Sequence, residues 1–557
     1  NKKITNYDWD NNEVREKRTP YSADRRYQKT LSKNFTLYAD YKKNFNDRHD
    51  LSVMVGTSHE SENYDRFTAK RINFDQQENM SLQLGSAQDQ NAWSEGNQWT
   101  INSFFSRVNY TFANKYVIEG TIRADGSSRF DPDHRWGWFP GVNAAWRVGE
   151  EGFMKRLGWF EDLKVRASYG EMGNQSGIGL YDYIQLISLS NDYYPFGTGV
   201  KGQMATSGNI ISTSRTWETI QTTNVGFDFS TLNNRLYGSF DYFWKENKNM
   251  LIPKTYPSML GADAPSTNSG HLSIHGWEIS LGWRDQIKDF SYSVRFNISD
   301  AKNKVVDRVG SNLIKLGNNE TPTGYPLNSY FGYEFDGIIQ NEQELEAYKS
   351  RFSEGGIPGD LSVGDAMYKD LDGDGKLSVL GDGKEGSGDV KYLGDKNPRY
   401  NFGFNLSMAW KGFDLSAFIQ GVGRRTMFLE GESRCPMPEA WYQSAEYWYG
   451  KTWTPERTDA QYPAITLKDK RNYNYYVSTN TKFNVAYARL KNLQFGYTIP
   501  QTLTSKAGLQ KVRVYFSGED LFEVHNTPNG WDPEENSGSI TSYPFTRNYS
   551  FGINVVF

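Results

Sequence analysis

One segment of the chain carries acidic residues at the spacing of a calcium-binding loop. Asp370, Asp372 and Asp374 occupy alternate positions in the run DLDGDGKL (370–377), with glycines between and after them. Alternate carboxylates supply oxygen ligands for Ca²⁺, and glycine permits the tight turn that wraps these oxygens around the ion. The pattern therefore predicts a structural Ca²⁺ site in the segment 355–395, which we expect to be an extracellular loop.

Two further ligands of this site follow from the same spacing. The backbone carbonyl of Lys376 stands where the loop would offer a fourth oxygen. An EF-hand places an acidic residue at its twelfth position, which here is Gly381, and Asp382 stands one residue later as a substitute. The alternative is an acidic turn without a metal. In either case the loop would be structural, and no cofactor for catalysis is expected.

Aromatic side chains concentrate in two other segments, where they could stack on sugar rings or bind peptides. The candidate ligand-binding residues are Trp441, Tyr442, Trp448, Tyr473 and Tyr475 in the segment 422–482, and Tyr193 and Tyr194 in NDYYPF (191–196). We expect both segments to be extracellular loops. The alternative is that these rings pack the loops together or against a partner, which is the commoner use of such residues.

Sequence patterns that mark an enzyme are missing. The six histidines include no HExxH pair, and His271 and His275 lie in a strand context, where they would not converge on a metal as helical ligands do. No GxSxG elbow, Walker loop or GxGxxG run is present. The single cysteine, Cys435, has no motif around it. The sequence thus gives no support for catalysis.

Composition narrows the class of protein further. The net charge of -4 offers no basic surface for nucleic acid. Aromatic residues make up 15% of the chain, which excludes a disordered polypeptide. No apolar run reaches the eighteen residues of a membrane helix. The mean hydropathy of -0.72 still suits a membrane barrel, since only alternate side chains of its strands face lipid.

The parts of the chain between the predicted loops show strict alternation of apolar and polar residues. In the segment 277–298, Trp277, Ile279, Leu281 and Trp283 share one face, and after the turn RDQIKD the alternation resumes from Phe290. Such alternation predicts strands with one apolar and one polar face. Further hairpins are predicted in 35–55, 108–122, 225–244 and 402–419, and a final strand in 549–557.

Aromatic residues recur where these strands meet short turns, as in the pairs Phe112–Tyr116, Trp283–Phe290 and Trp410–Phe413. An interfacial aromatic girdle has this arrangement. The segments 171–215, 300–400 and 422–482 are too long for loops of a compact domain, but they suit the external loops of a barrel. We therefore expect an all-β, large antiparallel transmembrane β-barrel occupying the whole chain, 1–557, and prefer it to a soluble all-β array.

Several runs resemble barrel segments of SusC/RagA-type TonB-dependent outer-membrane transporters. They are GSSRFDPDHRWGWFPGVNAAWRVGEEGFM (126–154), LKVRASYGEMGNQ (163–175), WETIQTTNVGFDFSTLNNRLYGSFDYFWKENKNML (217–251), ARLKNLQFGYTIPQTL (488–503), VRVYFSGEDLF (512–522) and WDPE (531–534). The resemblance implies a 22-stranded barrel with an N-terminal plug in the outer membrane. It also implies a SusD-like lipoprotein partner, the TonB–ExbB–ExbD complex as energy source, and an oligosaccharide or peptide ligand.

The chain contains no segment resembling the plug or the TonB-contacting region, so we expect both to lie outside it. The spacing of the predicted strands gives ~14 strands, and the remaining strands must come from elsewhere because an open sheet edge is untenable in lipid. A passive porin is the alternative function, and an outer-membrane enzyme or adhesin a third class without support from the residues.

Overall fold

The computed structural model describes most of the chain. The described residues are 6–7, 13–14, 22–74, 81–88, 90–190, 195–196, 200–201, 204–208, 210–253, 259, 265–308, 317, 321–380, 388–438, 444–466, 469–535, 543 and 545–557. Fifteen strands form one antiparallel sheet in which each strand pairs with its predecessor and successor in the sheet, so that the order follows the chain from β3 to β27.

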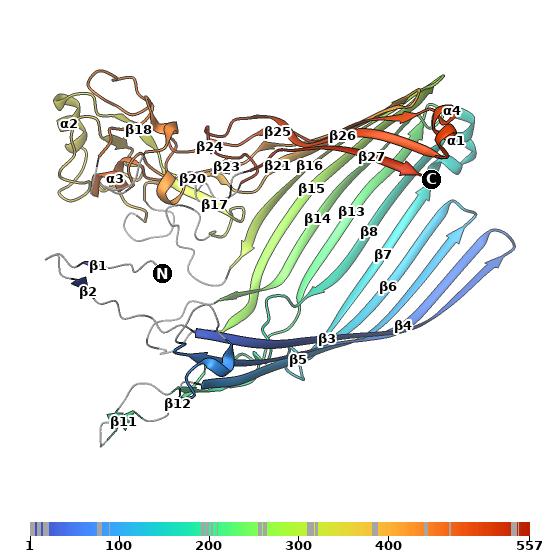
Figure 1. Cartoon of the computed structure of the whole chain (residues 1–557), viewed down its shortest axis with the longest axis horizontal. Coiled ribbons are helices and arrows are strands. Elements are labelled where there is room, and N and C mark those ends of the chain that lie inside the picture. Colours follow the sequence, from blue (N-terminus) through green and yellow to red (C-terminus); the bar gives the residue numbers. More distant parts are fainter. Residues whose placement is uncertain are drawn as a thin grey trace.

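The strands of the large sheet are numbered with gaps, because the short strands between them belong to the connections. They are β3 (Ser22–Phe45), β4 (His49–Ile72), β5 (Gln90–Phe112), β6 (Tyr116–Ser127), β7 (Trp136–Arg147), β8 (Asp162–Asn174), β13 (Glu218–Thr231), β14 (Leu236–Pro253), β15 (Ser266–Ile287), β16 (Phe290–Asp307), β21 (Arg399–Trp410), β22 (Phe413–Arg424), β25 (Tyr487–Ile499), β26 (Lys511–His525) and β27 (Asn548–Val556). The sheet curves into a trough whose two edges are β3 and β27 (Figure 1).

The predicted hairpins are confirmed, and their register explains the alternation. Across β15 and β16, Ile279 pairs with Ile298, Leu281 with Phe296 and Trp283 with Val294. Paired residues of antiparallel strands share a face, so the apolar residues of both strands form one surface. The turn is shorter than the predicted RDQIKD, since β15 continues to Ile287 and only Lys288 and Asp289 remain outside the strands.

The backbone conformation of the short turns fits these hairpins. Between β21 and β22, Lys411 and Gly412 form a two-residue turn in which both residues have positive φ, 46° and 91°. A turn with positive φ at both central residues matches the right-handed twist of the flanking strands, and glycine adopts that conformation without steric cost. Trp410 and Phe413 are thereby paired across the hairpin end.

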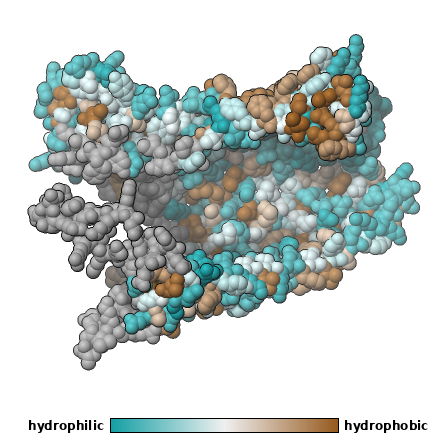
Figure 2. Space-filling model, viewed as in Figure 1, coloured by the Kyte–Doolittle hydropathy of each residue, from teal (hydrophilic) through white to brown (hydrophobic). Residues whose placement is uncertain are grey.

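Among the residues that the structure describes, many side chains on the apolar face of the sheet are exposed. On the last strand, Phe551 is 84% exposed and Ile553 67%, and Trp138 on β7 is 65% exposed. Figure 2 shows the brown, hydrophobic residues concentrated over the C-terminal strands at the upper right, with hydrophilic residues towards both ends of the sheet. So large an exposed apolar surface is stable when it faces lipid, which is the arrangement of an outer-membrane barrel.

The connections alternate between short and long along the chain. One end of the sheet carries turns such as residues 46–48, 113–115 and 288–289, and the other carries the connections 175–217, 308–398 and 425–486. The predicted pattern of long segments is thus observed, with strands extending a few residues into each. The sheet has fifteen strands against the expected fourteen, because hairpins with short turns repeat faster than the average spacing.

Three of the long connections pack into a folded body, here called the loop lobe, comprising the described residues of 308–398, 425–486 and 526–547. Its cores join the connections: Tyr333, Leu345, Tyr348 and Tyr368 pack with Tyr473, and Met427, Tyr447 and Tyr475 pack with Trp531. The lobe lies at the end of β15 to β26 opposite the C-terminus (Figure 1).

Short elements complete the structure. The paired short strands are β1 (Asn6–Tyr7) with β2 (Glu13–Val14), β9 (Ile187–Ser190) with β12 (Met204–Ser207), β10 (Pro195–Phe196) with β11 (Val200–Lys201), β17 (Ser329–Tyr333) with β20 (Val390–Asp395), β18 (Phe335–Ile338) with β19 (Ala366–Tyr368), and β23 (Thr426–Met427) with β24 (Phe483–Asn484). The α-helices are α1 (Gly152–Leu157), α2 (Glu342–Lys349), α3 (Asp469–Asn474) and α4 (Gln501–Thr504). Among the described residues, no helix combines the length and apolarity needed to cross a membrane.

A charged residue on the apolar face should prevent assembly, whereas the same residue on the polar face should not. Leu281→Arg places a guanidinium against lipid, at a cost of about 2–4 kcal/mol near the bilayer midplane. Ser280→Arg is the matched control, since Ser280 faces the other side beside Asn297. We expect loss of the folded, heat-modifiable form of the full-length protein in outer membranes for Leu281→Arg alone. Equal folding of both variants would contradict the assignment of faces.

Candidate functional site

The three aspartates of the segment 355–395 lie close together. One carboxylate oxygen from each of Asp370, Asp372 and Asp374 lies within 4.8 Å of the others. The backbone curls around them: Gly373 N and Gly375 N donate to Asp370 at 2.7 and 2.9 Å. Three converging carboxylates are the chemistry that Ca²⁺ prefers.

A further carboxylate lies behind the loop. Asp389 accepts hydrogen bonds from Leu371 N at 2.6 Å and Ser378 N at 2.7 Å, and so ties the two ends of the loop together. Burial, together with the neighbouring Asp372 and Asp370, raises the pKa of the Asp389 carboxyl. Lys376 N donates to Asp374 at 2.7 Å, and the role of the Lys376 carbonyl as a fourth ligand stays a prediction. Asp382 lies outside the described residues, and metal binding by this set stays a prediction.

Of the aromatic candidates, Trp448, Tyr473 and Tyr475 lie inside the cores of the loop lobe, at 3%, 2% and 1% exposure. The Tyr473 hydroxyl is 2.8 Å from that of Tyr348, and Tyr475 donates to Pro463 O at 3.0 Å. Burial raises the pKa of both phenols.

These three residues therefore join the long connections to one another, as the packing alternative holds, and in this arrangement none of them offers a free ring face. Substrate binding by them remains a prediction without support from their burial. Trp441, Tyr442, Tyr193 and Tyr194 lie outside the described residues.

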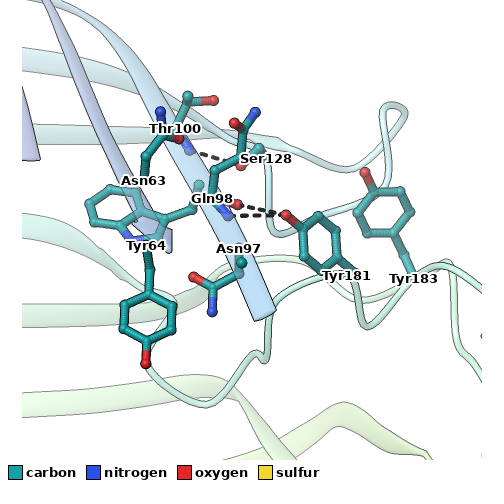
Figure 3. Close-up of a pocket in the computed structure, with 10 residues that line it drawn as sticks. Asn63, Tyr64, Asn97, Gln98, Thr100, Ser128, Tyr181 and Tyr183 are labelled. Carbon is teal, nitrogen blue, oxygen red and sulfur yellow. Dashed lines mark hydrogen bonds between the residues drawn. The ribbon is translucent and has the colours of Figure 1, made fainter. Parts of the chain in front are cut away.

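A groove that the sequence did not indicate lies where β5 extends past β6. It has a volume of about 510 Å³, and ten residues line it: Asn63, Tyr64, Gly96, Asn97, Gln98, Trp99, Thr100, Ser128, Tyr181 and Tyr183. Figure 3 shows Tyr181 and Tyr183 reaching it from the connection between β8 and β13, with Asn97 between Tyr64 and Tyr181. All ten residues are uncharged, so the groove suits a neutral polar ligand.

The polar face of the sheet carries ion pairs. Arg166 on β8 binds Asp241 through both terminal nitrogens, at 2.5 and 2.7 Å, and also contacts Asp228 at 3.2 Å. On β26, Arg513 forms the same kind of pair with Asp414 of β22. Charged side chains on this face require an aqueous surround, which is the lumen in an outer-membrane barrel.

A buried arginine fastens the connection 526–547 to the sheet. The Arg489 side chain is 1% exposed and pairs with Asp532 at 2.6 Å and Glu534 at 3.1 Å. The ring of Phe545 lies 4.2 Å from its guanidinium carbon. The WDPE run singled out in the sequence therefore supplies the counter-charges of a buried cation.

An antiparallel wall with an exposed apolar face, an ion-paired polar face and long connections at one end defines an outer-membrane barrel wall. A family model described as "TonB dependent receptor-like, beta-barrel" matches residues 2–521. The chain belongs to this family of outer-membrane transporters, which are not enzymes, and the predicted fold and SusC/RagA-type resemblance are confirmed.

Individual relatives agree with this assignment. The chain is 31% identical to "TonB-dependent receptor P3" of Formosa agariphila over 95% of its length, and 26% identical to "TonB-dependent receptor SusC" of Bacteroides thetaiotaomicron over 97%. It spans 52% of each of these proteins. The solved "RagAB peptide transporter" has the same fold, with a TM-score of 0.79 and 23% identity over 96% of this chain and 56% of that one.

Calcium should stabilise the acidic loop if the three aspartates bind it. At a concentration one hundred times its Kd, a ligand that binds only the folded state contributes about 2.7 kcal/mol. We expect EGTA to accelerate proteolysis between residues 355 and 395, and added Ca²⁺ to reverse this effect. The double variant Asp370→Asn with Asp372→Asn should lose the Ca²⁺ response, whereas Glu354→Gln, an exposed acid of the same lobe, should keep it. An unchanged cleavage rate with and without Ca²⁺ in the native protein would rule out the site.

Removing the buried arginine should loosen the connection 526–547. Arg489→Met removes the cation that pairs with Asp532 and leaves Glu534 with Lys491, at 3.1 Å, at a cost of about 3–5 kcal/mol. Arg547→Met is the matched control, because Arg547 also pairs with Glu523 but is 47% exposed, and such surface pairs contribute about 0–1 kcal/mol. Thermal unfolding and proteolysis of the connection are the measurements. Similar losses in both variants would refute the role of Arg489 as its fastening.

Proposed function

We propose that the whole protein imports oligosaccharides or oligopeptides across the bacterial outer membrane by TonB-dependent active transport. The observation that supports this most is the match of residues 2–521 to the TonB-dependent receptor barrel. The wall agrees with it, since the apolar face is exposed and the polar face carries ion pairs such as Arg166 with Asp241. Import through such a wall needs a water-filled interior, which the polar face would line.

The partners belong to the same proposal. Energy would come from the TonB–ExbB–ExbD complex, acting on a plug outside this chain. A SusD-like lipoprotein would cover the external end, where the loop lobe offers a folded surface made by three connections. The names of the relatives support this direction, since one is SusC and one solved neighbour is the RagAB peptide transporter.

In this proposal the lobe is a platform and not a catalytic centre. A Ca²⁺ ion bound by Asp370, Asp372 and Asp374 would hold the turn that joins β19 to β20. The buried tyrosines on both sides of that turn then keep the connections in one arrangement. A rigid external surface of this kind suits a protein that repeatedly captures and releases ligand beneath the SusD-like lipoprotein.

Passive diffusion through a porin is the competing function. Active import requires TonB and passive diffusion does not, so deletion of TonB distinguishes them. A strain expressing the full-length protein with its lipoprotein partner is supplied with fluorescent malto-oligosaccharides in one arm and with a fluorescent tryptic digest of casein in the other. We expect accumulation of at least one probe, and its loss when TonB is deleted.

The matched control is the same strain without the transporter gene, which sets the background for both probes. Uptake that continues unchanged without TonB would overturn active transport and leave the porin alternative. No accumulation of either probe above background would contradict both ligand classes of the proposal.

A further inference from the structure

Strand β5 is paired on one side along its whole length but on the other side along only half of it. Its pairing with β4 runs from Gln90 opposite Arg71 to Phe112 opposite His49. Its pairing with β6 covers only Ile101 to Phe112. From Gln90 to Thr100 the edge of β5 towards β6 therefore has no neighbouring strand among the residues that the structure describes.

The first two positions of this edge, Thr100 and Gln98, have partners in Ser128 and Tyr181. Thr100 N donates to Ser128 Oγ at 2.9 Å, and Ser128 N donates to Thr100 O at 2.9 Å. Gln98 N donates to the Tyr181 hydroxyl at 3.1 Å, and that hydroxyl donates to Gln98 O at 3.3 Å. Alternate residues of a strand direct their backbone groups to the same side, so the next edge positions are Gly96, Ser94 and Ala92.

These next positions have no backbone partner in the described part of the chain. The contrast is the overhang of β16, where Val305 N donates to Tyr325 O at 2.9 Å and Val305 O accepts from Gly324 N at 2.8 Å. There the protein covers its own edge with the connection 308–398. A strand edge left open presents a row of donors and acceptors that readily takes up a further strand.

The groove described above lies beside this open edge. Gly96 lines it, so an added chain can approach the β5 backbone at that point without meeting a side chain. Tyr64, Asn97 and Tyr183 flank the same space and would surround the side chains of an added strand (Figure 3). Backbone groups along the edge with side-chain space beside them are the features of β-strand addition.

We propose that a short extended peptide binds to β5 as an additional strand, hydrogen-bonded to Gly96 and Ser94. The edge is closed at one end by Tyr181 and Ser128, so the peptide must end there. The open stretch of β5 begins at Gln90 and reaches Gly96, which leaves room for a peptide of about seven residues, or ~23 Å. A bounded edge of this length suits a free peptide better than a strand that belongs to a larger partner and has to continue.

This inference chooses between the two ligand classes of the proposed function and rests on it for its biological role. It is tested by binding alone, so a failure of transport leaves it standing. A sugar would have to be held by side chains, and the ring of Trp99 already lies 5.7 Å from the Arg129 guanidinium carbon. The regular backbone donors of β5 fit a polypeptide backbone better than a sugar.

The experiment is hydrogen exchange of the full-length protein in detergent, followed in peptic fragments that cover residues 90–98. A tryptic digest of casein is added in one arm and malto-oligosaccharides in the other. We expect exchange at Ser94 and Gly96 to slow by about tenfold or more with the peptides, since two edge hydrogen bonds form, and to stay unchanged with the sugars. Protection by sugars alone, or slow exchange before any addition, would overturn the proposal.

Two variants separate backbone recognition from recognition by side chains. Gly96→Pro removes an edge donor, and proline is tolerated where the N–H faces away from the sheet. Asn97→Ala removes an amide that lines the groove but keeps the pairing of residue 97 with Tyr64. We expect peptide binding to weaken about tenfold in Gly96→Pro and to change little in Asn97→Ala, and the reverse order would overturn strand addition. Ser94→Pro makes the same test if Gly96→Pro does not fold, as judged by heat modifiability.

Discussion

A peptide N–H or carbonyl in hydrocarbon has no water to bond, and each one left unpaired costs several kcal/mol. The arrangement of the sheet follows from that constraint. The strands pair with their neighbours in continuous order from β3 to β27, and their alternate side chains then divide between lipid and an aqueous face. Long connections are possible only where the sheet leaves the hydrocarbon, which places all of them at the ends of strands.

Above the membrane the same constraint is met in different ways. The overhang of β16 is covered by Tyr325 and Gly324 of its own connection. Among the described residues, the overhang of β5 is covered as far as Gln98, by Ser128 and by the hydroxyl of Tyr181. Water satisfies exposed backbone groups there, so an open edge is stable outside the bilayer where it would not be within it. The wall thus combines a continuous ladder from β3 to β27 with a stretch of β5 that, among the described residues, has a neighbouring strand on one side only.

The hairpins were predictable from the sequence because the two faces of each strand meet different solvents. Apolar residues such as Leu281 and Phe296 therefore alternate with polar neighbours. Strand ends were less predictable, since the polar residues of β3, β4 and β5 beyond the lipid carry no alternation. The spacing of Asp370, Asp372 and Asp374 also predicted their convergence. The type of residue alone could not tell a buried Tyr475 from a ligand-binding one. The groove joins residues as distant in sequence as Tyr64, Ser128 and Tyr181, and no local pattern indicates such a meeting.

The shared cores of the loop lobe bear on how the protein can diverge. Tyr348 of one connection is 2.8 Å from Tyr473 of another, and Trp531 of a third packs with Tyr447 and Tyr475. A change of side-chain volume at any of these positions alters the packing of connections that are far apart in the sequence. The buried positions of the lobe must therefore co-vary as one inherited block, and exchanging a single connection between paralogues would disrupt the other two. Diversification is left to the exposed positions of the lobe, where residues can be replaced one at a time.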